Sequence, residues 1–195
     1  EEVAERQYTR TLLFSQVVDL MGSVVCNVRP AIHAAFQAKA ESIGVSLRAV
    51  YDKIDRTEPG VSAELVRHTA RTLAPVISAM AGQRQPWLPG YPIKILDGNH
   101  LAGTRHRLKE LRAIGAGALP GHALVVLDPQ AMLVTDVFPC EDGHAQERSL
   151  PDRVPETIRS GEVGIADRNF RTTGFLFGIA RRGGYYVIRQ HKVTL

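Results

Sequence analysis

Two aspartates are the residues of this chain whose type and position best suit catalysis. Asp97 follows the largely apolar run Ile93–Leu96, and Asp167 follows the run Val163–Ala166. Short apolar runs bounded by turn residues are typical of buried strands, so both carboxylates are expected at strand ends. A carboxylate in such a place needs a partner charge, a hydrogen bond or a metal ion. We predict that Asp97 and Asp167 meet in space and share divalent metal ions, Mg²⁺ or Mn²⁺.

Each aspartate also has a simpler interpretation. Asp97 is followed by Gly98, and Asp-Gly is a common turn dipeptide. Asp167 could cap the N-terminus of the helix that follows it. Two further acidic residues are expected to have structural roles: Asp128 to open a hairpin turn, and Asp136, on an alternating strand, to face solvent.

Basic residues accompany the second aspartate. Arg168, Asn169 and Arg171 follow Asp167 directly, and we predict that they contact the phosphates of a DNA strand. The arginines could also hold Asp167 in place through a salt bridge, and both roles could be filled at once. A second DNA-binding patch is predicted on a short helix at 105–112, formed by Arg105, Arg107, Lys109 and Arg112. Such phosphate contacts should weaken steeply with salt.

Charge is distributed unevenly along the 195 residues, whose formal net charge is +4. Residues 91–195 carry 14 basic and 11 acidic side chains, against 10 and 9 in residues 1–90. A basic block beside a metal site suits a polyanion such as nucleic acid, although many charge runs are only solvated surface. No run approaches the roughly 20 apolar residues of a membrane span, so no membrane partner is expected.

Cysteines and histidines show no metal-binding spacing in the sequence. Cys26 and Cys140 lie far apart and form no C-x-x-C motif, which suggests a reducing compartment and no zinc site. His100 and His106, six positions apart, also have a poor spacing for a metal site.

Residues 1–82 are predicted to be helical. Apolar residues at three- and four-residue spacing indicate helices over 8–25, 30–43, 47–56 and 63–80, the last kinked or broken at Pro75. Two Gly-Val-Ser tripeptides place Ser46 and Ser62 as N-caps of the third and fourth helices. A short helix, a turn and a longer helix are compatible with helix-turn-helix binding to DNA. Residues 83–92, rich in proline, are predicted to be a linker.

Residues 93–195 change to a strand pattern. The predicted order is strand, strand, strand, helix, strand, helix, strand, with strands at 93–97, 123–127, 133–138, 162–167 and 185–190. This is the order of an RNase H-like domain, in which an antiparallel meander is extended by parallel strands beside the first strand. The predicted fold is therefore α+β: an all-helical N-terminal region followed by an incomplete RNase H-like domain with a mixed five-stranded sheet. In that fold Asp97 and Asp167 lie on neighbouring strands.

Four motifs carry a resemblance to a known family. The sequences D-G-N-H-L at 97–101, R-L-K-E-L-R at 107–112, L-V-V-L-D at 124–128 and A-D-R-N-F at 166–170 resemble insertion-sequence transposases of the DDE class, in the subgroup with a Y-R-E-K glutamate motif. The resemblance covers about residues 92–191. It implies that Asp97 and Asp167 are the first two members of a metal-binding triad. It also implies cleavage at transposon ends in double-stranded DNA, transfer of the 3′-OH to target DNA, a homodimer on DNA, and a bacterial, nucleoid-associated place in the cytoplasm.

One departure from the family pattern concerns the third carboxylate. The family's glutamate lies on a helix well after the fifth strand, and no Y-x-x-R-x-x-x-E arrangement occurs before Leu195. We therefore expect the chain to be an inactive fragment of such a transposase. The alternative is a non-catalytic DNA-binding protein that acts through its helical N-terminal region.

Overall fold

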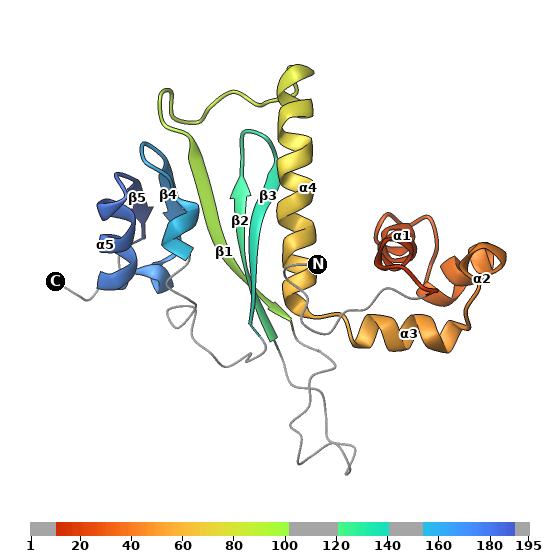
Figure 1. Cartoon of the computed structure of the whole chain (residues 1–195). Coiled ribbons are helices and arrows are strands. Elements are labelled where there is room, and N and C mark those ends of the chain that lie inside the picture. The colour runs from red at the N-terminus through yellow and green to blue at the C-terminus, as the bar shows by residue number, and fades with distance from the viewer. Residues whose placement is uncertain (1–10, 102–120, 141–153, 190–195) are drawn as a thin grey trace, which may run out of the picture. The chain divides into compact units, whose positions relative to one another are not determined.

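The computed structural model describes residues 11–101, 121–140 and 154–189. Within these residues the fold is α+β, with five α-helices and one mixed five-stranded open sheet (Figure 1). The chain divides into two compact units, Glu1–Ser62 and Ala63–Leu195, and each is described by itself. The predicted helix at 105–112 lies outside the described residues. None of the described helices combines the length and apolar character of a membrane span.

The first unit is built from three helices, α1 (Phe14–Val25), α2 (Ile32–Ile43) and α3 (Leu47–Asp55). Gly44 ends α2 in the left-handed region with φ 65°, a conformation that suits glycine. The predicted cap of α3 is confirmed, because the Ser46 side chain accepts a hydrogen bond from the Ala49 amide. The helices pack around the buried side chains of Leu12, Val17, Leu20, Ala35, Ile43 and Val50.

Helix α4 (Pro59–Ala79) differs from its prediction at two points. It begins at Pro59, so Ser62 lies in its first turn and is not its N-cap. Proline is favoured at the first helical position, where its missing N–H costs nothing. A kink or a break was predicted at Pro75, and the break is wrong, since the helix continues through Pro75 to Ala79.

The sheet belongs to the second unit and has the strand order β3-β2-β1-β4-β5 (Figure 1). β1, β2 and β3 form an antiparallel meander, whereas β4 and β5 run parallel to β1. The strands are β1 (Ile93–Leu101), β2 (Gly121–Asp128), β3 (Leu133–Cys140), β4 (Val163–Ala166) and β5 (Tyr185–Ile188). The predicted order and directions of the strands are thus observed.

One face of this sheet carries the core of the second unit. Helix α5 (Thr173–Arg181) and the 3₁₀ helix η3 (Val154–Thr157) contribute to the same core, which contains Leu96, Leu124, Val126, Phe138, Val154, Ile158, Ala166, Phe170 and Ile179. Close packing leaves no room at Gly184, where a Cβ atom would stand 2.9 Å from Ile179 Cγ2 and 3.0 Å from Ile158 Cγ2.

The predicted linker at 83–92 contains no helix or strand, yet it is bonded to the sheet. The Arg84 amide donates to the Gln130 carbonyl at 2.8 Å, and the Val163 amide donates to the Pro92 carbonyl at 2.8 Å. The rings of Tyr91 and Tyr185 meet edge to face at 5.5 Å. The division between the compact units falls upstream of this segment, between Ser62 and Ala63.

Candidate active site

Asp97 lies in the middle of β1 and not at its end as predicted. It stands opposite Val125 of β2, and Gly98 stands opposite Leu124. The alternative of an Asp-Gly turn is therefore wrong. β2 pairs with β1 as far as Leu101, which keeps the polar residues after Asp97 in an extended conformation.

The strand register brings Asp97 next to Asp167. In the parallel pair of β1 and β4, the last matched residues are Leu96 and Ala166, so the two aspartates occupy the next position on neighbouring chains. Neighbouring strands lie about 4.8 Å apart, so the two aspartates follow directly from backbone positions that are paired in the sheet. Successive side chains of a strand point to opposite faces. Asp97 therefore lies on the face opposite buried Leu96, and both aspartates are exposed.

Asp167 is held by a cap of its own. One of its carboxylate oxygens, Oδ1, accepts a hydrogen bond of 2.7 Å from the Asn169 amide and caps the 3₁₀ helix η4 (Arg168–Phe170). The sequence allowed a cap on the following α-helix, but that helix, α5, is capped by Thr172. Within the described chain the second oxygen, Oδ2, has no bonding partner, so it is open to a ligand.

The short helix η4 presents the predicted DNA-binding residues around Asp167. Phe170 is 4% exposed, belongs to the core and contacts the Phe175 ring at 5.6 Å. This buried ring anchors η4, while the side chains of Arg168, Asn169 and Arg171 are exposed. Among the described residues no ion pair joins Asp167 to Arg168 or Arg171. The predicted residues of the second patch, Arg105, Arg107, Lys109 and Arg112, lie outside the described residues.

The donor set fits a hard divalent cation. Two adjacent carboxylates repel each other unless a cation lies between them. Mg²⁺ prefers oxygen ligands and keeps several waters, so it can be held by one or two carboxylates together with phosphate oxygens. The described segments contain no group of three or more histidine, cysteine, aspartate or glutamate side chains that could hold a metal. Asp97 and Asp167 therefore form a candidate site with two protein ligands.

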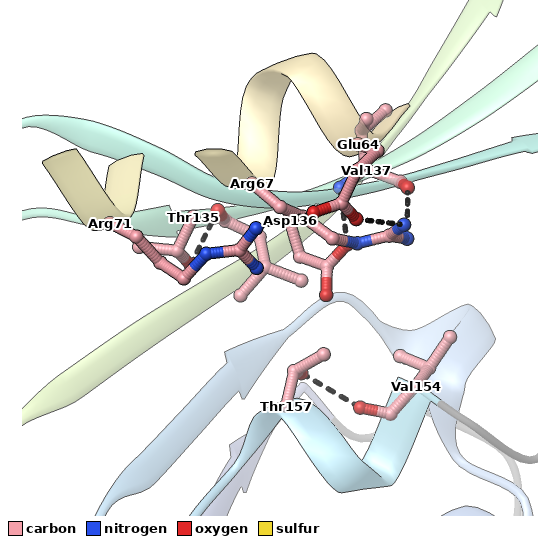
Figure 2. A network of polar contacts seen from close by, with 9 residues as sticks. Glu64, Arg67, Arg71, Thr135, Asp136, Val137, Val154 and Thr157 are labelled. Carbon is pink, nitrogen blue, oxygen red and sulfur yellow. Dashed lines mark hydrogen bonds and ion pairs between the residues drawn. The ribbon is translucent and has the colours of Figure 1, made fainter. Parts of the chain in front are cut away.

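Asp136, on the packed face, contrasts with this pair. It was predicted to face solvent, but Arg67 of α4 donates to its Oδ1 from Nε at 2.6 Å (Figure 2). Arg67 also donates to the Val137 carbonyl at 3.1 Å and lies 5.7 Å from the centre of the Phe138 ring. Glu64 bonds both Arg67 and Arg71, and these bonds, that from Arg71 first, lower the pKa of Glu64. The network joins α4 to β3.

Asp128 is likewise satisfied within the fold. The prediction that it opens the hairpin turn is confirmed, because its Oδ1 accepts from the amides of Gln130 and Ala131 at 2.9 and 3.0 Å. Its Oδ2 accepts from Lys94 Nζ at 2.8 Å. Partial burial raises the pKa of Asp128, but the bonds from Lys94 and the two amides outweigh it and hold the pKa below its ordinary value. Asp128 is therefore a structural residue.

A polar cavity of about 400 Å³ lies over this face of the sheet. Its charged lining is largely paired within the fold through Arg67–Asp136 and Lys94–Asp128. The cavity is lined by Arg67, Ala70, Arg71, Ala74, Lys94, Asp128, Thr135, Asp136, Phe138, Glu156, Thr157 and Arg159. It is separated by the sheet from the Asp97 carboxylate, because Lys94 and Asp97 alternate to opposite faces of β1.

One pair of histidines that could bind a ligand was not identified from the sequence. His100 and His122 stand directly opposite each other on β1 and β2. Nδ1 of His100 lies 3.5 Å from Nε2 of His122. The two positions are 22 apart in sequence, so only the strand register could have revealed the pair.

Comparison with known proteins identifies no relative of this chain. No protein-family model matches the chain, and no curated protein matches it significantly. The assignment of a function therefore rests on the strand topology and on the geometry of the site.

Proposed function

We propose that this protein is a DNA transposase of the DDE class, whose second unit is an RNase H-like core that binds Mg²⁺ or Mn²⁺ through Asp97 and Asp167. The observation that supports the proposal is the parallel register of β1 and β4, which pairs Leu96 with Ala166, the residues directly before Asp97 and Asp167. The sheet order β3-β2-β1-β4-β5, with its antiparallel meander, supports the RNase H-like assignment.

The residues at and around the aspartate pair have different proposed roles in phosphoryl transfer. Asp97 and Asp167 would hold the cations. Bound cations would activate an attacking oxygen and stabilise the leaving oxygen of the DNA strand. Arg168, Asn169 and Arg171 contact the phosphates beside the cleaved bond and fix the register of the DNA. Further phosphate contacts are proposed for Arg105, Arg107, Lys109 and Arg112, which lie outside the described residues.

The wider setting follows from the same proposal. The substrates are double-stranded transposon ends and target DNA, and the product of the first step is a free 3′-OH that attacks the target. A homodimer on paired ends in the bacterial cytoplasm, at the nucleoid, is the assembly that the proposal implies, and without the glutamate of the triad residues 1–195 are proposed to be inactive.

Binding of Mn²⁺ is the direct test of the carboxylate pair. Electron paramagnetic resonance of free Mn²⁺ measures binding by the whole chain in the presence of a short DNA duplex. We expect D97N and D167N each to lower the affinity for Mn²⁺ at least tenfold, roughly the scale seen on losing a ligand-supporting group. E41Q, which removes an exposed charge on α2, is the matched control and should bind Mn²⁺ as the parent does. Equal binding by parent, D97N and D167N would reject the site.

DNA contact by η4 is tested separately through the salt dependence of binding. The double variant R168A/R171A removes two candidate phosphate contacts, so the slope of log affinity against log salt should fall by about 2. Fluorescence anisotropy of a labelled duplex provides the measurement. A slope that matches the parent's would place the DNA elsewhere.

The alternative function is non-catalytic DNA binding through the helical region. It is favoured by the three residues, 56–58, that separate α3 from α4, a turn of helix-turn-helix length. Arg48 is exposed on α3. If R48A weakens DNA binding while R168A/R171A leaves it unchanged, the helical region is the DNA-binding part and the alternative is preferred.

A further inference from the structure

The histidine pair on β1 and β2 lies apart from the carboxylate pair. His100 is three residues beyond Asp97, which is about 10 Å along a strand. The alternation of side chains also puts His100 on the face of Leu96, opposite the face of Asp97. Ligands of the two sites therefore do not compete for the same atoms.

The spacing of the two ring nitrogens is compatible with a shared metal ion. Nδ1 of His100 and Nε2 of His122 are 3.5 Å apart, and the ring centres are 4.9 Å apart. A zinc ion lies about 2.05 Å from a histidine nitrogen. Two such bonds across 3.5 Å give an N–Zn–N angle of about 117°, close to the tetrahedral value.

The surroundings of His122 leave its pair nitrogen as the atom available to a ligand. Nδ1 of His122 is buried and has no hydrogen-bond partner among the described residues. Nε2 of His122 lies within 3.5 Å of Nδ1 of His100. A neutral imidazole has one N–H donor and one accepting lone pair, so in a hydrogen bond between these two nitrogens one ring donates and the other accepts. A cation between the two nitrogens would use both lone pairs at once.

We propose that His100 and His122 bind a borderline transition-metal cation, Zn²⁺ in the first place. Imidazole nitrogen is a preferred ligand of zinc, whereas Mg²⁺ prefers oxygen. The remaining coordination positions are filled by water, in keeping with a site of two protein ligands. This zinc site is independent of the proposed transposase activity, because it uses neither Asp97 nor Asp167.

Calorimetric titration of the whole chain with ZnCl₂ in excess MgCl₂ tests this proposal. Excess Mg²⁺ occupies the oxygen ligands, so the heat reports the nitrogen site. The parent should bind one zinc ion per chain, and H100A should lower that affinity at least about tenfold. H68A, which removes a single exposed histidine on α4, should bind zinc as the parent does, and so should D97N.

The variants at the buried position need a check of folding. H122A and H122Q are both made, and the fluorescence of Trp87, which lies beside Ile93 and Gln130 in the second unit, reports whether the sheet has formed. His100 is exposed, so H100A decides the matter even if both His122 variants unfold. Zinc binding by H100A equal to that of the parent overturns the proposal, as does a loss in H68A of the size seen in H100A. Loss of Mn²⁺ binding in D97N with zinc binding retained would separate the two sites.

Discussion

The two faces of the sheet differ in whether their acidic side chains are bonded within the fold. On the packed face, Asp136 and Asp128 are partly buried and bonded to Arg67 and Lys94. On the other face, Asp97 is exposed and has no bonding partner in the described parts of the chain, and Asp167 has only its cap. A carboxylate that the fold satisfies stabilises the fold, whereas one that it leaves open is available to a ligand. The comparison predicts that stability and metal binding respond to different aspartates.

The largest effect on stability is expected from Arg67 on the packed face. R67A leaves the half-buried carboxylate of Asp136 without its partner and removes the bond to the Val137 carbonyl. We expect a loss of about 2 kcal/mol in the free energy of unfolding. Urea unfolding followed by Trp87 fluorescence measures it, and the affinity for Mn²⁺ should not change. If R67A lowered the Mn²⁺ affinity as well as the stability, the two faces of the sheet would not have separate roles.

The next effect concerns acid and Asp128. Because its folded pKa lies below the ordinary value, the stabilisation is present above the unfolded pKa of about 3.9 and is lost as the pH falls through the folded pKa. D128N should lower stability by about 1 kcal/mol at neutral pH. It should also flatten the fall in stability below pH of about 4. Urea midpoints of D128N and the parent across the acid range test this.

The smallest effects are expected on the open face. D167A removes the cap of η4 and should cost about 1 kcal/mol, whereas D167N keeps a capping side chain and should stay within about 0.5 kcal/mol of the parent. D97N should be as stable as the parent, or slightly more stable, because one of two neighbouring charges is gone. Thermal unfolding compares the three variants. A marked loss of stability in D97N would mean that the open face also holds the fold.

Much of the second unit could be predicted from local patterns. Apolar runs such as Val163–Ala166 gave the strands and their order, and Asp128 gave the hairpin. The extent of β1 could not be predicted, because Asp97-Gly98-Asn99 has the composition of a turn and is extended here through its pairing with β2.

Two of the remaining errors have the same physical cause: the interacting partner is distant in sequence. Asp136 was assigned to solvent because its partner, Arg67, is 69 residues away on a helix. The contact of His100 with His122 depends on a register that periodicity does not specify. In α4 the cause was local: a proline at the first helical position took precedence over a serine cap at Ser62.

The shared position of β1 between β2 and β4 has a consequence for changes in chain length. The pairing that buries Leu96 is the pairing that exposes Asp97. Deletion of one residue from Ile93–Leu96 would shift the strand's alternation and turn the carboxylate inward as the leucine turned out. The alternation of side chains along β1 therefore sets both the core and the candidate site. A genetic insertion or deletion in this strand cannot damage one and spare the other.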